Sequence, residues 1–304
     1  MTAGPPLAGW LQRHGRIALW LGLCWVLAEL PQAWAQSAAV LQARHGALQD
    51  KLASNAFQRP LVLESSEASS GLKGDIYARI DQPFTMLAAA LGTGSHWCDI
   101  LILHLNVSQC RFSGAAPNET LQLAIGSKYD RPLEQAYRLT FAYRLVAAQP
   151  DYLHVSLTAD EGPLDTRDYR ITLEVVALDA RRSFLHLSYA YDYGAAARLA
   201  MQGYLATLGR DKVGFSVIGR KLDGQPQFIG STRGVVERNT MRYYLAIEAY
   251  LGAVTLPRAQ QFERRLADWH SGVERYPLQL HELERDEYLA LKRAQVQRQQ
   301  AAGG

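Results

Sequence analysis

Several absences narrow the functions open to this chain. Its 304 residues include only 3 cysteines, so it is not a disulfide-rich scaffold. Neither sign of charge dominates, because 32 Lys and Arg residues face 29 Asp and Glu residues, for a formal net charge of +3. A nucleic-acid-binding protein needs basic residues massed on one face, so nucleic acid is not an expected partner. With 48% apolar and 20% charged residues, the composition is that of a globular protein.

Motifs for catalysis and for metal binding are also scarce. No GxSxG or HExxH pattern occurs, since His281-Glu282 is not followed by a second histidine at the required spacing. The segment Gly209 to Phe215 lacks the spacing of a phosphate-binding loop. We therefore expect no cofactor and no metal site. His96 and His104 are the best candidates for acid–base chemistry, and whether the protein is an enzyme stays open.

The first 35 residues have the three parts of a secretory signal. Basic Arg13 and Arg16 precede an apolar run from Ile17 to Ala28, and Ala33-Trp34-Ala35 forms a small-x-small cleavage site. The run is 12 residues long, shorter than the ~20 that a transmembrane helix needs, so cleavage is favoured over anchoring. The sequence predicts a periplasmic protein that is cleaved after Ala35.

Two cysteines, Cys98 and Cys110, remain in the mature chain. In an oxidising compartment two such cysteines usually pair, so we predict a disulfide. Free thiols, or a metal site with His96 and His104, are the alternatives. No CxxC or His-x-x-x-His spacing supports metal binding.

Alternation of apolar and polar residues recurs through the middle of the chain. In Lys73 to Asp81, Ile76, Ala78 and Ile80 share one face of a strand. Five further strands follow the same rule, with apolar positions at Leu121/Leu123/Ile125, Tyr137/Leu139/Phe141/Tyr143/Leu145, Leu153/Val155/Leu157, Tyr169/Ile171/Leu173/Val175 and Leu185/Leu187/Tyr189/Tyr191/Tyr193. Short turns between one-sided strands predict an antiparallel sheet and exclude a parallel one.

Helical spacing flanks this sheet on both sides. Helices are predicted at Ser37 to Leu52, Phe84 to Leu91, Ala195 to Leu208, Gly234 to Ala253, Arg258 to His270 and Pro277 to Gln299. Glu64 to Gly71 is interpreted as a loop, and Val213 to Val217 with Gln227 to Gly230 as a hairpin. The helix from Gly234 is the natural cover for the apolar face of the sheet.

These elements define an α+β chain: a curved antiparallel sheet that grips a long C-terminal helix, with extra helices after it. We divide it into a signal peptide (1–35), an N-terminal helix and linker (36–70), a main domain (71–256) and a charged C-terminal helical arm (257–304). In that arm Phe262, Leu266 and Trp269 form an apolar stripe that docks on the domain or binds a partner.

The order of elements from Gly71 to Ala253 resembles that of helix-grip proteins of the START/SRPBCC superfamily. His96-Trp97-Cys98-Asp99, Gly209 to Phe215 and Arg233 to Leu245 resemble, more specifically, a group of exported proteobacterial proteins of unassigned function. The superfamily resemblance implies a cavity between sheet and helix that takes hydrophobic ligands. The helix Ala195 to Leu208, the hairpin after it and the C-terminal arm are additions to the minimal fold.

Tyrosine is unusually common on the predicted inner faces. Such a cluster suggests an amphipathic pocket, although the same residues also suit a packed core. Arg238 and Arg242 either anchor an anionic head group or form ion pairs with Glu237, Glu248 or Asp211. The predicted pocket lining is Tyr143, Tyr169, Tyr189, Tyr191, Tyr244, Met241, Arg238 and Arg242. His154 and His186 are placed on the solvated outer face.

The leading interpretation is a periplasmic binding or transfer protein for a hydrophobic or amphipathic, lipid-like ligand. An envelope module that binds a partner through the charged arm, and an enzyme of the polyketide-cyclase-like type, are the alternatives. A peripheral contact with a membrane or an envelope protein stays open. The sequence does not identify the ligand, the partner or the oligomeric state.

Overall fold

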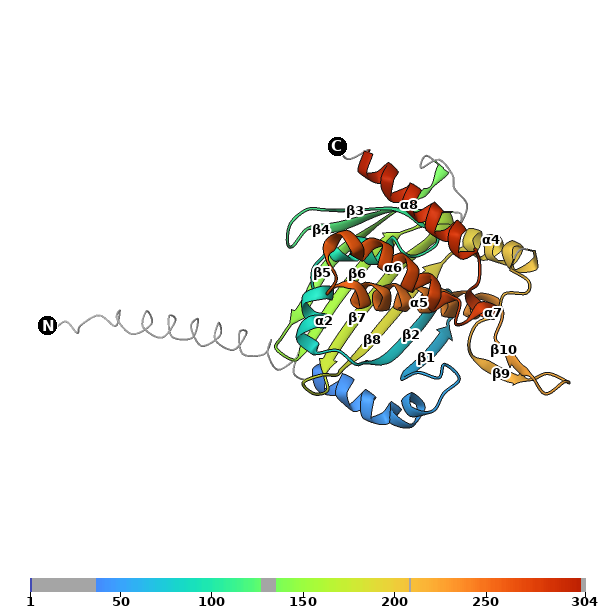
Figure 1. The fold of residues 1–304 in the computed structure, drawn as a ribbon, viewed down its shortest axis with the longest axis horizontal. Coiled ribbons are helices and arrows are strands. Elements are labelled where there is room, and N and C mark those ends of the chain that lie inside the picture. Colours follow the sequence, from blue (N-terminus) through green and yellow to red (C-terminus); the bar gives the residue numbers. More distant parts are fainter. Residues whose placement is uncertain (2–36, 127–134, 208, 302–304) are drawn as a thin grey trace.

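The computed structural model describes Met1 and residues 37–126, 135–207 and 209–301. The predicted signal peptide beyond Met1, and Leu208, lie outside this description. Within it, eight strands form one sheet in the order β1-β2-β8-β7-β6-β5-β4-β3, and every neighbouring pair is antiparallel (Figure 1). The strands are β1 Leu61–Glu67, β2 Gly71–Ile80, β3 Val107–Ser113, β4 Glu119–Ile125, β5 Tyr137–Ala148, β6 Tyr152–Glu161, β7 Thr166–Ala177 and β8 Ser183–Tyr193.

Two of these strands were not predicted. β1 occupies part of the expected loop Glu64 to Gly71, because its polar residues pair with β2 in continuous register from Leu61↔Ala78 to Glu67↔Leu72. β3 escaped notice because its pairing with β4 shifts between Val107 and Gln109, which breaks the simple alternation. Both strands lie at edges of the sheet, where one side forms no ladder and sequence patterns are weak.

The helix α5, Ser231–Ala253, lies across one face of the sheet and contacts β1, β2 and β8 (Figure 1). At Thr240 the helix lies against β2, where a Cβ atom on Gly74 would collide with the threonine side chain. Glycine at this position therefore lets the helix sit close to the sheet. The predicted α+β fold class, an antiparallel sheet that grips a long helix, is confirmed.

Shorter helices lie on the same side of the sheet as α5. They are α2 Phe84–Leu91 and α3 His96–Leu101, followed near the C-terminus by α6 Arg258–Val273, α7 Pro277–Leu280 and α8 Arg285–Ala301. The predicted disulfide between Cys98 and Cys110 is present and joins α3 to β3. Gln299 in α8 accepts a hydrogen bond from the Cys110 backbone N–H (3.0 Å) and donates one to its carbonyl oxygen (2.7 Å).

The C-terminal helices pack on the domain. Leu266 and Trp269 of α6 are buried against the main core, and Phe262 packs beside them. The expected single helix from Pro277 is interrupted at 281–284. Side chains donate hydrogen bonds to backbone carbonyl oxygens there: Lys212 donates to the carbonyl of His281 (2.8 Å) and Arg242 to that of Leu280 (3.4 Å). These bonds satisfy carbonyl oxygens that would accept backbone N–H groups if the helix continued.

The opposite face of the sheet is covered in part by the helix of residues 37–53. Leu41, Leu48 and Leu52 form a second core there, with Tyr152 and Phe184 among their partners. No helix of the described residues is long and apolar enough to cross a membrane.

The segment between β8 and α5 contains α4, Ala195–Ala206, and a hairpin of β9 Val217–Arg220 and β10 Pro226–Phe228. The hairpin was predicted from Val213 to Val217 and from Gln227 to Gly230; its first strand begins four residues later than predicted, and its second strand ends two residues earlier. The reason lies in Glu237 of α5, whose fully buried carboxylate accepts hydrogen bonds from the backbone N–H groups of Phe215 and Ser216 (2.6 and 2.9 Å). The hydroxyls of Ser216 and Ser65 also donate to it, each at 2.6 Å.

We expect Glu237→Ala to lower the free energy of unfolding by about 3 kcal/mol, because it leaves several buried donors without an acceptor. Urea denaturation measures this change. Glu284→Ala, which removes a carboxylate with 84% exposure, serves as the control and should have little effect. Equal stability of the two variants would contradict the anchoring role of Glu237.

Candidate functional site

Four tyrosines gather between the sheet and α5. Tyr169 of β7 stacks on Tyr191 of β8 with ring centroids 5.3 Å apart, and Tyr189 lies 5.5 Å from Tyr191. Tyr243 of α5 closes the group, 5.1 Å from Tyr189. The period-two alternation of β8 puts Tyr189 and Tyr191 on the same face, and the helix brings Tyr243 to meet them. We call Tyr169, Tyr189, Tyr191 and Tyr243 the tyrosine cluster.

The hydroxyls of the tyrosine cluster are poorly partnered. Tyr169 donates to Thr166 Oγ1 at 2.8 Å. The hydroxyls of Tyr189, Tyr191 and Tyr243 have no hydrogen-bond partner among the described residues. None of these three oxygen atoms is fully shielded from solvent. Tyr243 keeps accessible surface although it lies inside the fold. Burial raises the pKa of all three phenols, and the neighbouring hydroxyls raise it further.

His104 adjoins this cluster, with its ring 4.8 Å from that of Tyr243. Its Nδ1 accepts the backbone N–H of Asn106 at 3.2 Å, so in the neutral ring the proton is on Nε2. Nε2 is buried and has no partner in the described part of the chain. Burial, and then the charges of Arg242 and Lys292, lower the pKa of His104, so the ring is neutral at physiological pH.

The other predicted residues have partners within the protein. The Tyr143 hydroxyl donates to the carbonyl of Gly92 (2.7 Å), that of Tyr244 donates to Glu248 (3.3 Å), and Met241 is fully buried. His96 Nδ1 lies 2.9 Å from the carbonyl oxygen of Ala90. None of these four joins the tyrosine cluster.

Arg238 and Arg242 lie on the side of α5 that faces α7 and residues 209–213. Arg238 donates to the carbonyl of Val213 at 3.2 Å. Arg242 pairs with Glu282 at 3.1 Å, whereas Glu237, Glu248 and Asp211 were the partners considered from the sequence. Glu282 is distant in sequence, and no local spacing could have revealed this pair.

A second polar group, on the opposite face of the sheet, was not found from the sequence. His186 of β8 lies between Asp75 of β2 and Glu174 of β7, with one ring nitrogen 2.9 Å from each carboxylate. Tyr152 donates to Glu174 (2.6 Å), and the ring of Tyr77 stacks on His186 at 4.4 Å. The side chain of His186 is only 13% exposed, so the expected solvated histidine is wrong: the group screens it from water.

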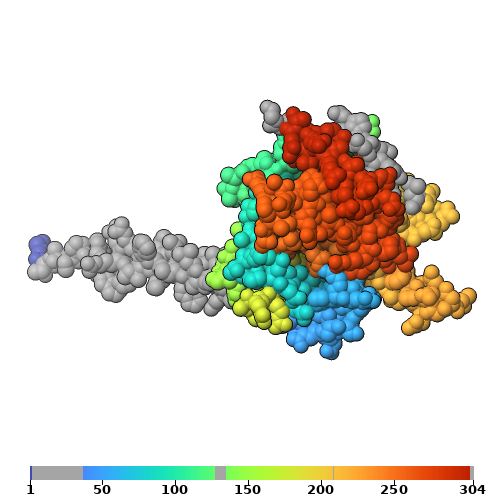
Figure 2. Space-filling model, viewed as in Figure 1, coloured from blue at the N-terminus to red at the C-terminus, as the bar shows by residue number. Residues whose placement is uncertain are grey.

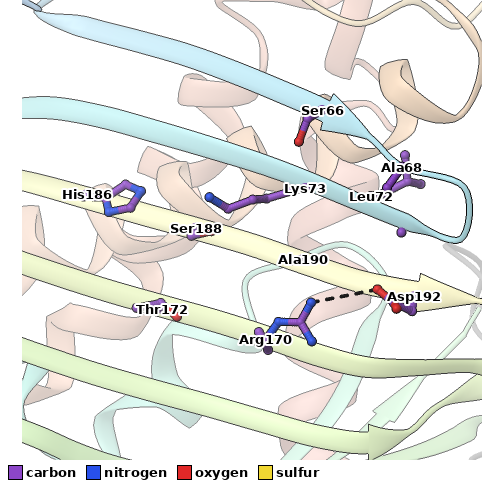
Figure 3. Close-up of a pocket in the computed structure, with 11 residues that line it drawn as sticks. Ser66, Ala68, Leu72, Lys73, Arg170, Thr172, His186, Ser188, Ala190 and Asp192 are labelled. Carbon is purple, nitrogen blue, oxygen red and sulfur yellow. Dashed lines mark ion pairs between the residues drawn. The ribbon is translucent and has the colours of Figure 1, made fainter.

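Two open depressions border this group. One, of about 510 Å³, includes Lys73, Arg170, His186, Ser188 and Asp192, which lie across neighbouring strands in Figure 3. The other, of about 490 Å³, lies between the helix of residues 37–53 and the sheet. Nowhere in the described ranges do three or more His, Cys, Asp or Glu side chains gather in a way that could hold a metal ion.

The His186 group should make stability depend on pH. Burial alone would lower the pKa of His186, but the hydrogen bonds to Asp75 and Glu174 outweigh it and raise this pKa above its ordinary 6.5. Stabilisation by protonated His186 is therefore complete below about pH 6.5 and is lost as the pH rises through the raised value. Burial would raise the pKa values of Asp75 and Glu174, but the bonds to His186, together with Lys73 beside Asp75 and Tyr152 beside Glu174, outweigh it and lower both, so their contribution is lost in acid.

We expect the wild-type free energy of unfolding to fall between about pH 6 and about pH 8 relative to that of His186→Asn, because only the wild type loses the protonated His186, whereas the lowered pKa values of His45, His104 and His154 affect both proteins alike. Denaturation across this range measures it. His154, on the same face, has a pKa lowered mainly by burial, so His154→Asn should retain the fall. An unchanged slope in His186→Asn would refute the assignment.

Comparison with known proteins adds little about the site. No protein-family model matches the chain, and no curated protein matches its sequence. Among solved structures, the Zhui aromatase/cyclase from Streptomyces sp. R1128 is 10% identical, with a TM-score of 0.32 over 46% of this chain and 73% of that one. A norcoclaurine synthase from Thalictrum flavum is 13% identical, with a TM-score of 0.32 over 49% of this chain and 91% of that one. Such low scores carry no functional argument.

Proposed function

We propose that this chain is an exported binding or transfer protein for an amphipathic ligand, held at the tyrosine cluster between the sheet and α5. The observation that carries this proposal is the set of three phenol hydroxyls, from Tyr189, Tyr191 and Tyr243, without protein partners. These hydroxyls keep some accessible surface inside an otherwise apolar space, so a bound ligand can accept or donate the hydrogen bonds that water would otherwise make with them. A ligand with polar atoms next to an apolar body matches these needs.

The surroundings of the cluster suit the apolar part of such a ligand. The facing surfaces carry Phe141, Ile171 and Leu187 from the sheet, all buried in the main core. Burial of a ligand chain contributes roughly 25 cal/mol per Å² of apolar surface. The hydroxyls then orient the ligand, and movement of a loop beside the cluster governs exchange.

The C-terminal helices favour this interpretation over a partner-binding arm. Leu266 and Trp269, the centre of the apolar stripe predicted for that arm, are buried within the protein. They are therefore not available to another protein unless α6 detaches.

Acid–base catalysis is the second candidate, and His104 is the observation that favours it. Its Nε2–H is unpartnered among the described residues and its ring adjoins Tyr243, so the neutral ring can donate a hydrogen bond that polarises a bound carbonyl group. If His104→Asn binds ligand normally but converts none, catalysis is indicated. If wild type leaves the ligand unchanged, binding alone remains.

The first test is native mass spectrometry of the exported protein purified without detergent, followed by organic extraction. We expect a mature chain that begins at Gln36 and carries a stoichiometric hydrophobic molecule. Retention of residues 1–35 in the periplasmic fraction would argue against cleavage. An empty protein that also binds no fluorescent fatty acid would contradict the carrier function.

We expect Tyr189→Phe with Tyr243→Phe to weaken binding of a fluorescent fatty acid by about thirtyfold, since each of the two hydrogen bonds contributes about 1 kcal/mol. Fluorescence titration measures the dissociation constant. Tyr137→Phe, at an exposed position on β5, is the matched control and should bind as wild type does. Wild-type affinity in the double variant would exclude these hydroxyls from the site.

A further inference from the structure

The segment between β8 and α5 projects from the body of the protein. In Figure 1, α4 and the β9–β10 hairpin extend on the same side of the molecule, and Figure 2 shows both protruding past the C-terminal helices. Of the residues in α4, only Ala197 is buried. From Val217 to Gln227 the hairpin has no buried residue at all.

Large apolar side chains are exposed on both projections. Leu222, at the hairpin tip, is fully exposed. Val217 and Ile218 of β9 are 54% and 57% exposed, and Leu199 of α4 is 71% exposed. Three of these residues lie within one short hairpin, and such a concentration of exposed apolar side chains marks a contact surface more often than an isolated leucine does.

Positive charge is concentrated in the same segment. Residues 195–228 contain five basic residues (Arg198, Arg210, Lys212, Arg220 and Lys221) and two acidic ones (Asp211 and Asp223), a net charge of +3. The whole chain also has a net charge of +3, so the rest is neutral overall. Arg220 and Lys221 directly precede Leu222 and are exposed with it.

The hairpin is held firmly at its base although its tip is free. Glu237 binds Phe215 and Ser216, and the Gly214 N–H donates to the carbonyl of Ile229 at 2.6 Å. The tip therefore projects from a fixed base.

We propose that the β9–β10 hairpin, together with α4, docks the protein on the surface of a bilayer that carries anionic lipids. Leu222 enters the acyl boundary, while Arg220 and Lys221 contact lipid phosphates. Apolar insertion combined with basic residues is the chemistry of peripheral membrane binding. Leu222 protrudes beside the cations Arg220 and Lys221, and the deformable surface of an anionic bilayer can take up such a side chain. A protein partner would need a hollow of complementary shape at the same place.

This docking surface is separate from the tyrosine cluster, so the two proposals can fail independently. Membrane binding is measured on protein without added ligand, and ligand retention is measured on the same variants by native mass spectrometry. Leu222→Ser should leave ligand retention unchanged.

The test is co-sedimentation with vesicles of phosphatidylcholine and phosphatidylglycerol, against vesicles of phosphatidylcholine alone. We expect binding to the anionic vesicles that weakens as salt is added. Leu222→Ser should weaken it by about tenfold, and Arg220→Gln with Lys221→Gln by about tenfold as well.

The matched control is Leu145→Ser with Arg181→Gln. Leu145 is 45% exposed, and Arg181 lies in the exposed turn between β7 and β8, at the end of these strands opposite α4. Thermal melts verify that all variants fold. The proposal is overturned if anionic vesicles do not bind the wild type, if both vesicle types bind equally, or if the hairpin variants bind as tightly as the control.

Discussion

The close seating of α5 on the sheet is the contact on which the other features depend. It requires glycine at position 74, against Thr240, and it is secured by Glu237, whose buried carboxylate joins β1, α5 and the base of the projecting hairpin. Because α5 is fixed in this way, Tyr243 meets Tyr189 on the sheet side, while Arg238 and Arg242 are directed to α7 and its neighbours. One helix thus separates the apolar interior from the ionic groups.

Much of this fold could be predicted because the sheet has one apolar face. The alternation in β2 and in β4 to β8 identified those strands, and the stripe on α5 identified the helix that covers them. The edge strands β1 and β3 were missed, since polar residues in one and a shifted register in the other hide the alternation. The break before α8 depends on Lys212 and Arg242, which are distant in sequence.

The sites show the same limit. Three members of the tyrosine cluster, on β7 and β8, follow from strand periodicity, but the ring of His104 reaches Tyr243 from the connection between α3 and β3. The Asp75–His186–Glu174 group depends on which strands are neighbours: β8 lies between β2 and β7, although β2 is far from both in sequence. Periodicity puts a residue on a face, and only the strand order shows what lies beside it.

The contact of Gln299 with β3 has a consequence for how the chain matures. An edge strand with free backbone groups is a template for pairing with another chain, and here an amide from the last helix occupies the N–H and C=O of Cys110. Gln299 follows Cys110 by 189 residues, so it is synthesised long after β3. Until Gln299 has been synthesised and α8 has packed, the backbone groups of Cys110 lack this partner, and β3 is more open to pairing with another chain.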